Sequence, residues 1–221
     1  MTISPDVLAT SRESLHRAAE HLLSAALKRA TGQIALLPAE GGVRTPELPD
    51  GTVVALDGVD VVVRGPAGER RSPLTTLAGT AADLGLEAGF PWNKHPPGTP
   101  FEPDAELVVD PAAAAALARW FLVGRDALSA LVTEIRDEGP SEPVVFPEHF
   151  DLGVTAAEVN YGFSPGDETV PSPYAYVGPW EKPGDDPFWD LPFGAARGWD
   201  EITTPGQALE FFRAARRRIG R

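Results

Sequence analysis

The pattern that most restricts the fold is a long run of helical periodicity over residues 110–136. Asp110 and Pro111 open it with an acidic cap and a proline at the first helical position, where proline is tolerated. Gly124 lies inside the run, where it costs about 1 kcal/mol relative to alanine, so we expect close packing there. The apolar positions span about six turns and comprise Leu117, Trp120, Phe121, Leu128, Leu131, Val132 and Ile135.

The rest of the chain alternates between helical and strand-like periodicity. We expect an N-terminal helix within residues 1–31 and strands, a hairpin and a short helix within 32–109. Further strands are expected within 143–180 and a C-terminal helix within 204–219. β-Branched runs on both sides of Asp57 and Gly58 indicate the hairpin turn. This order predicts an α+β fold in one domain, with a mainly antiparallel sheet and helices packed on one face.

Composition excludes several classes of protein. The 221 residues carry a formal net charge of −13, which makes nucleic-acid binding improbable because phosphate backbones would be repelled. The absence of cysteine excludes disulfides and thiolate metal sites. No apolar run approaches the ~18 residues of a membrane span, and residues 1–15 lack a secretory signal pattern. We therefore expect a cytoplasmic protein that does not bind membranes.

No cofactor motif is present. The chain lacks a phosphate-binding loop, a dinucleotide fingerprint, a nucleophile elbow and an HExxH zinc motif, so the cofactor stays unassigned. On an α-helix His16 and His21 would lie about 140° apart, too far to share a metal. His16 and Glu20 are four residues apart, and we expect both to face solvent. We also expect His95 to be exposed in its proline-rich loop.

The candidate catalytic residues are Glu148, His149 and Asp151 of the segment PEHFD. On a strand, His149 and Asp151 would share one face, about 6.6 Å apart along the chain. Such a carboxylate can orient an imidazole or join it as a metal ligand. A metal would need a third ligand, such as Glu158 or Asp167, so no metal site is assigned. A structural hydrogen bond is the alternative reading of this pair.

The candidate ligand-binding residues follow in the next 30 positions. Ser164 to Asp167 fit a tight turn, and a turn alone explains their types. Tyr174 and Tyr176 would share a strand face, with Ala175 and Val177 opposite. Aromatic rings beside carboxylates and an amide are typical of a polar small-molecule pocket and equally of a core edge. The predicted set is Asn160, Asp167, Tyr174, Tyr176 and Trp180.

The segments PEHFDL, SPGD and PYAYVGPW resemble the signature of an uncharacterised actinobacterial protein family. The stretch ATGQIALLPAEGGVRTP near the N-terminus is similar as well. The resemblance covers about two-thirds of the chain and implies no activity, because the family has none assigned. It implies that residues 148–180 are the signature region, for structural or functional reasons.

Three functions fit these patterns. The first is binding of a small polar ligand in a cleft formed by residues 145–180. The second is a metal-assisted or acid–base hydrolase or isomerase that uses His149 and nearby carboxylates. The third is a protein-interaction module in the acidic, aromatic C-terminal third, with a basic partner or a second copy of the chain as its target. Residues 137–201 carry 14 acidic side chains and two basic ones.

Overall fold

The computed structural model describes residues 3–91, 97–181 and 184–221, so His95 lies outside the described residues. The described chain consists of helices and two antiparallel sheets, which confirms the α+β fold class. It divides into two compact units. The first unit comprises residues 1–119 and 145–150, and the second comprises residues 120–144 and 151–221. The single-domain organisation stays a prediction.

The first unit opens with one continuous helix that changes its winding twice. Ser4 caps it, because its side-chain oxygen accepts a hydrogen bond from the Val7 N–H at 3.3 Å. The central part is a π-helix, in which backbone bonds join residues five apart instead of four. Gly32 ends the helix with φ 80°. The three parts are α1 (Pro5–Ala18), the π-helix η1 (Ala19–Ser24) and α2 (Ala25–Thr31).

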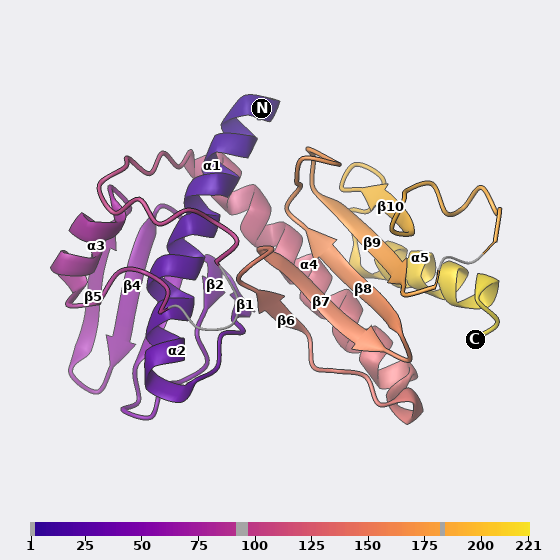
Figure 1. Cartoon of the computed structure of the whole chain (residues 1–221), viewed down its shortest axis with the longest axis horizontal. Helices are drawn as coiled ribbons and strands as arrows, with labels where there is room; N and C mark the ends of the chain where they lie inside the picture. The colour runs from indigo at the N-terminus through magenta and orange to yellow at the C-terminus, as the bar shows by residue number, and fades with distance from the viewer. Residues whose placement is uncertain (1–2, 92–96, 182–183) are drawn as a thin grey trace. The chain divides into compact units, whose positions relative to one another are not determined.

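A five-stranded antiparallel sheet completes the first unit (Figure 1). Its strands follow chain order, and the predicted hairpin joins β3 to β4, with Gly58 at φ 66°. Helix α3 packs on β4 and β5, and η1 packs on β3. The elements are β1 (Leu37–Ala39), β2 (Gly42–Arg44), β3 (Val53–Asp57), β4 (Asp60–Gly65), β5 (Gly68–Pro73) and α3 (Leu77–Leu84).

The second sheet has the strand order β10-β9-β8-β7-β6. Its last strand, β6 (Val144–Phe146), spans the boundary between the two units, and Val145 forms an antiparallel bridge with Leu36 inside the first unit. The other elements are α4 (Pro111–Glu134), the 3-10 helix η2 (Arg136–Glu138), β7 (Asp151–Ala156), β8 (Val159–Ser164), β9 (Tyr174–Pro179), β10 (Ala195–Gly198) and α5 (Pro205–Arg218).

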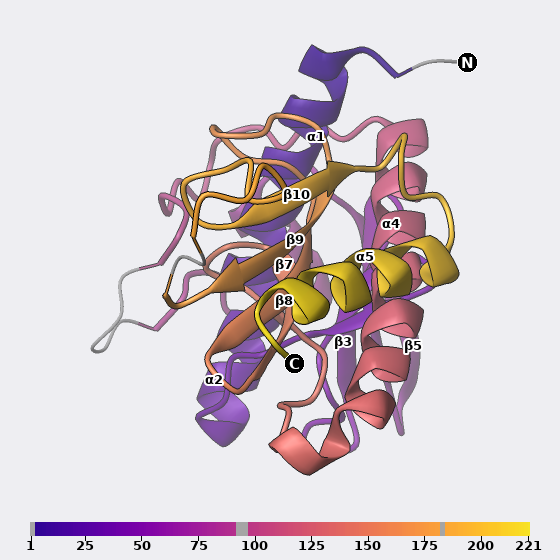
Figure 2. The same cartoon turned by 90° about the vertical axis from the view of Figure 1, so that its right-hand side faces the viewer.

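Helix α4 begins at the cap that the sequence predicts, and α5 also begins at a capping residue. The Asp110 carboxylate accepts the N–H groups of Ala112 and Ala113 at 2.9 Å, which starts α4. Thr204 and Gln207 form a reciprocal capping box at the start of α5. Helix α5 packs against β9 (Figure 2). Its arginines are held by acids of the same unit: Arg213 pairs with Glu134, and Arg216 with Glu138.

The core of the second unit lies on one face of its sheet. Phe163 is fully buried, and its ring meets the rings of Trp120 at 4.9 Å and Phe212 at 5.9 Å. The Trp120 indole N–H donates to the Ser164 carbonyl oxygen at 2.8 Å, so this large side chain is buried without an unsatisfied donor. A methyl group added at Gly124 would come within 2.7 Å of the Phe163 ring. The close helix packing expected at Gly124 is therefore confirmed.

Substitution of Gly124 by alanine should destabilise the protein, although alanine favours helix by about 1 kcal/mol. The added methyl has to displace Phe163 and Leu152, and such overpacking costs about 1–3 kcal/mol. Urea unfolding of the full chain measures the change. Gly206→Ala in α5 is the matched control, because no atom lies within 4 Å of the added methyl. A G124A protein as stable as G206A would contradict the packing argument.

Candidate functional site

The polar side chains of the predicted site lie on one face of the second sheet. Strand register places Tyr176 opposite Gly162, and Gly162 opposite Gly153. Because side chains alternate along a strand, one face is apolar and packs in the core, with Leu152, Val154, Tyr161, Phe163, Ala175 and Val177. The other face carries Asp151, Thr155, Asn160, Ser164, Tyr174 and Tyr176 together with the glycines.

Gly162 makes room for the Tyr176 ring. A methyl group at Gly162 would come within 2.4 Å of Tyr176 Cζ, so the ring lies directly over this glycine. The Tyr176 hydroxyl reaches across β8 and donates a hydrogen bond to Asp151 Oδ2 at the start of β7. A larger residue at Gly162 would block this path. The position therefore requires glycine for close approach and not for its backbone angles.

A second phenol–carboxylate pair lies beside the first. Asp167 Oδ1 accepts the backbone N–H groups of Thr169 and Val170 at 2.7 and 2.8 Å. Its other oxygen, Oδ2, accepts the hydroxyl of Tyr174 at 2.5 Å. Within the predicted turn, Gly166 has φ 99° and its N–H donates to the Ser164 hydroxyl oxygen at 3.1 Å, whereas the backbone bonds of the Asp167 carboxylate lie in the following residues 167–170. These bonds fix the carboxylate that accepts from the Tyr174 phenol. We call Asp151, Asp167, Tyr174 and Tyr176 the tyrosine–aspartate face.

Three aromatic rings pack together on this face. The Tyr174 and Tyr176 ring centroids are 6.1 Å apart, and Phe193 lies 6.3 Å from each of them. Tyr174 is buried, whereas Phe193 is 38% exposed and forms the edge of the cluster. Burial is the main cause that raises the pKa of Tyr174 and of Tyr176 above the ordinary value, and the carboxylates of Asp167 and Asp151 raise them further.

The other two predicted ligand-binding residues differ in their surroundings. Asn160 lies on the same sheet face, where its side-chain oxygen accepts the Thr155 hydroxyl at 2.8 Å. Trp180 follows the end of β9, and its backbone N–H donates to the Glu158 carbonyl oxygen at 2.9 Å. Its side chain is 65% exposed. Asn160 therefore belongs to the polar face, whereas Trp180 is a surface aromatic residue.

The prediction that Glu148, His149 and Phe150 form a strand is wrong. Residues 147–150 form a turn, closed by the His149 N–H and the Phe146 carbonyl oxygen at 3.3 Å, and Phe150 has φ 52°. Strand β7 begins only at Asp151. The period-two argument that placed His149 and Asp151 on one strand face therefore does not apply. His149 is exposed, and Phe150 is buried against the His16 ring at 5.3 Å.

A buried polar cluster in the first unit escaped the sequence prediction. Glu20 is 1% exposed and His21 fully buried, so the expectation that Glu20 faces solvent is wrong, and His16 is only partly exposed. Glu20 Oε1 accepts the Gly98 N–H at 2.8 Å, and Oε2 accepts the N–H and the hydroxyl of Thr99 at 2.9 and 2.6 Å. Three hydrogen bonds thus satisfy this buried carboxylate.

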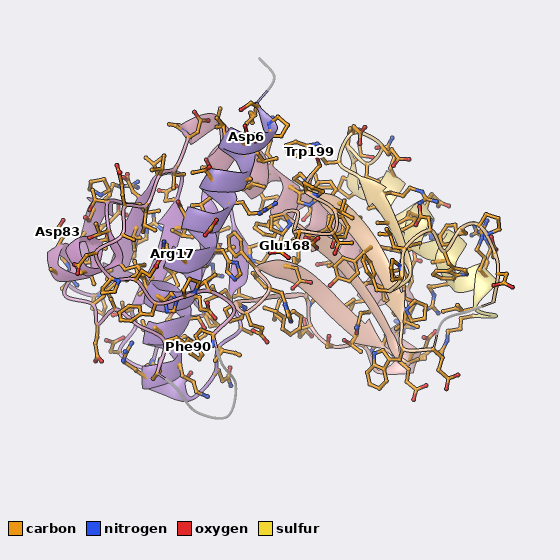
Figure 3. The ribbon with its side chains drawn as sticks, turned by 45° about the horizontal axis from the view of Figure 1, so that its top comes forward. Asp6, Arg17, Asp83, Phe90, Glu168 and Trp199 are labelled. Carbon is orange, nitrogen blue, oxygen red and sulfur yellow. The ribbon has the colours of Figure 1, made fainter. Side chains whose placement is uncertain are left out.

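Further side chains of the same helix hold the neighbouring loop. The His21 ring contacts the backbone of Phe90 and Thr99 at 3.2 Å each. Arg17 donates to the Glu102 carbonyl oxygen at 3.0 Å, and Arg29 donates to the carbonyl oxygens of Glu87 and Gly89. Figure 3 shows Arg17 and Phe90 on this side of the first unit. We call Arg17, Glu20, His21 and Arg29 the loop anchor.

The sequence contains a signal for this anchor. Glu20 and His21 stand within AAEHLLSAAL, a run that is otherwise small or apolar. Two ionisable residues inside such a run indicate buried, paired polar groups, because a buried charge without partners is costly. The π-helix was not foreseeable, and it invalidates the angle calculated for His16 and His21 on an α-helix. Burial is the main cause that lowers the pKa of His16, and electrostatic repulsion from His149 and His21 lowers it further.

Glu20→Gln should destabilise the full chain by about 1–3 kcal/mol, because the amide presents an NH₂ group to backbone N–H donors where the carboxylate accepted three bonds. Chemical denaturation measures this loss. Glu13→Gln on the exposed side of α1 is the matched control and should leave stability within about 0.5 kcal/mol. Equal stability of the two variants would show that the Glu20 carboxylate does not hold the loop.

The chain has only three tyrosines, Tyr161, Tyr174 and Tyr176, and the pKa of each is raised mainly by burial. At about pH 10 a free tyrosine is half ionised, whereas the folded protein should show little tyrosinate absorbance. The pKa of each tyrosine is higher in the folded than in the unfolded protein. The resulting stabilisation is therefore fully present below the unfolded pKa and is lost as the pH rises above about 10. Half-maximal absorbance at about pH 10 in the folded state would contradict these buried positions.

Among the residues that the structure describes, no group of three or more histidine or acidic side chains could hold a metal ion. Within the same residues no helix is long and apolar enough to span a membrane. Comparison of the chain with models of protein families, with curated proteins and with solved structures finds no match in any of the three. The chemistry of the side chains is therefore the basis for any functional assignment.

Proposed function

We propose that the tyrosine–aspartate face binds a small polar ligand that is rich in hydrogen-bond donors. The observation that carries this proposal is the pair of phenol–carboxylate hydrogen bonds, Tyr176 to Asp151 and Tyr174 to Asp167. The two pairs stand next to each other on one sheet face, with ring centroids 6.1 Å apart. Polar groups that converge beside aromatic rings are typical of small-molecule sites.

The kind of ligand follows from the hydrogen-bond donors and acceptors that the tyrosine–aspartate face offers. A phenol has one O–H donor and two acceptor lone pairs, and an ionised carboxylate only accepts. Because both phenol protons are donated to carboxylates, the oxygen atoms of the face retain acceptor capacity only. A complementary ligand therefore supplies donors, as polyols, sugars and organic amines do. The adjacent rings favour the apolar side of a sugar or an ammonium group.

The hydrolase or isomerase reading has less support. A general base has to lie within hydrogen-bonding reach of its partner and is usually oriented by a third group. His149 lies exposed in the 147–150 turn, and Asp151 accepts its hydrogen bond from Tyr176. The exposed Trp180 supports the interaction module as a second candidate, since single large aromatic residues anchor protein interfaces. We further propose that the protein acts in the cytoplasm, in keeping with its lack of cysteine.

A ligand panel tests the proposed function. Thermal unfolding of the full chain is recorded with polyols, sugars and amines, and with carboxylates that offer acceptors only. Donor-rich compounds should raise Tm by mass action, and the acceptor-only compounds should not. Calorimetry on each compound that raises Tm should show about tenfold weaker binding to Tyr176→Phe and Tyr174→Phe, because each variant removes an oxygen from the face.

Tyr161→Phe is the matched control. Tyr161 is on the same sheet, but its side chain lies on the core face against Phe212 and Arg216. This variant should be less stable yet bind the ligand with unchanged affinity. Equal affinity of all three variants, or a panel in which no donor-rich compound binds, would refute the proposal. Loss of a partner protein through Trp180→Ala would instead support the interaction module.

A further inference from the structure

His21 and Glu20 hold the two ends of one loop by different chemistry. On the side of residues 87–90, His21 Nδ1 lies 3.2 Å from the Phe90 backbone nitrogen, and the His21 carbonyl oxygen accepts the Gly89 N–H at 2.9 Å. On the side of residues 97–102, the Glu20 carboxylate accepts three hydrogen bonds from Gly98 and Thr99. The bond to Phe90 needs an unprotonated nitrogen on a ring that changes charge near neutral pH, whereas the bonds to the Glu20 carboxylate do not involve this ring.

The contacts of His21 specify its tautomer. The Phe90 N–H can donate only to a ring nitrogen that carries no proton, so Nδ1 is the acceptor. The proton of the neutral ring is then on Nε2, which lies 3.2 Å from the Thr99 carbonyl oxygen and donates to it. The neutral ring therefore joins both sides of the loop, accepting from Phe90 and donating to Thr99.

Protonation removes one of these two bonds. An imidazolium ring carries a proton on both nitrogens and has no acceptor in any orientation. The Phe90 N–H then faces another donor, whereas the bond to the Thr99 carbonyl oxygen can persist. Protonation of His21 leaves the hydrogen bonds that Gly98 and Thr99 donate to the Glu20 carboxylate in place. The two sides of the loop thus respond differently to acid.

The charges around His21 act in opposite directions. Burial lowers its pKa most, the Glu20 carboxylate, 3.8 Å away, raises it, and the Arg17 guanidinium lowers it. His16 is the other titratable neighbour on the helix. From the loop side, the described neighbours Phe90, Thr99 and Phe101 carry no charge. A lowered folded pKa means that acid favours the detached form, starting below the ordinary value of about 6.5.

We infer that His21 is an acid-sensitive anchor, whose protonation detaches the backbone at Phe90 from η1 while Glu20 keeps Gly98 and Thr99 attached. The detachment is local, because the Glu20 bonds and the packing of η1 on β3 do not involve a proton on His21. The acid-sensitive anchor does not involve the tyrosine–aspartate face, so a test that refutes one of the two proposals leaves the other unaffected.

Amide hydrogen exchange on the ¹⁵N-labelled full chain tests the anchor. Rates are measured by NMR at about pH 7.5 and at a pH below the titration midpoint of His21, and are divided by the intrinsic peptide rates. Protection of the Phe90 amide should fall by about tenfold or more at the lower pH, with a much smaller change at Gly98 and Thr99. Imidazole ¹⁵N shifts should report a neutral ring protonated on Nε2 and give the titration midpoint of His21.

His21→Asn removes the titration and keeps a side-chain oxygen that can accept the Phe90 N–H, so its Phe90 protection should not depend on pH. His149→Asn is the matched control, because His149 is exposed, and it should behave as the unaltered protein. If His21→Asn fails to fold, the pH dependence of amide protection at Phe90 and at Thr99 in the unaltered chain still tests the inference. Constant Phe90 protection through the His21 titration, or a loss that follows His16 or His149, would overturn the inference.

Discussion

Packing of the Phe163 ring against helix α4 is the contact on which the second unit depends. The ring fits because Gly124 offers no side chain, and it meets Trp120 and Phe212 in the same core. Since strand side chains alternate, burying Phe163 and its neighbours on one face fixes which residues appear on the other. The tyrosine–aspartate face therefore follows from the core packing. A shift of one residue in β8 would turn Asn160 and Ser164 toward the core and Phe163 away from it.

The first unit depends on a different constraint, namely that buried polar groups must be hydrogen-bonded. Glu20 and His21 lie inside the helix that packs on the sheet, where an unpaired carboxylate would cost several kcal/mol. Backbone N–H groups of Phe90, Gly98 and Thr99 supply most of the partners. The helix thus positions residues 87–90 and 97–102, which form no helix or strand of their own. The same hydrogen bonds therefore stabilise the unit and hold the loop in position.

The candidate site could be predicted in part. The alternation of Tyr174 and Tyr176 with Ala175 and Val177 placed both phenols on one face, and the register agrees. The turn at residues 147–150 could not be foreseen, because Phe150 adopts a positive φ that bulky residues rarely take. Burial of the Phe150 ring against His16 accompanies this conformation. That contact joins residues far apart in the chain, which no local pattern reports.

The sequence by itself predicted the long helix with its cap at Asp110, the N-terminal and C-terminal helices and the hairpin at Gly58, because these depend on neighbours within a few residues. It also predicted Asp151, Asp167, Tyr174 and Tyr176 as candidate site residues. Only the tertiary structure decided which side chains meet: Tyr176 with Asp151, Tyr174 with Asp167, and Glu20 with Thr99. The physical reason is that hydrogen bonds between distant residues are selected by packing, and packing is a property of the folded chain as a whole.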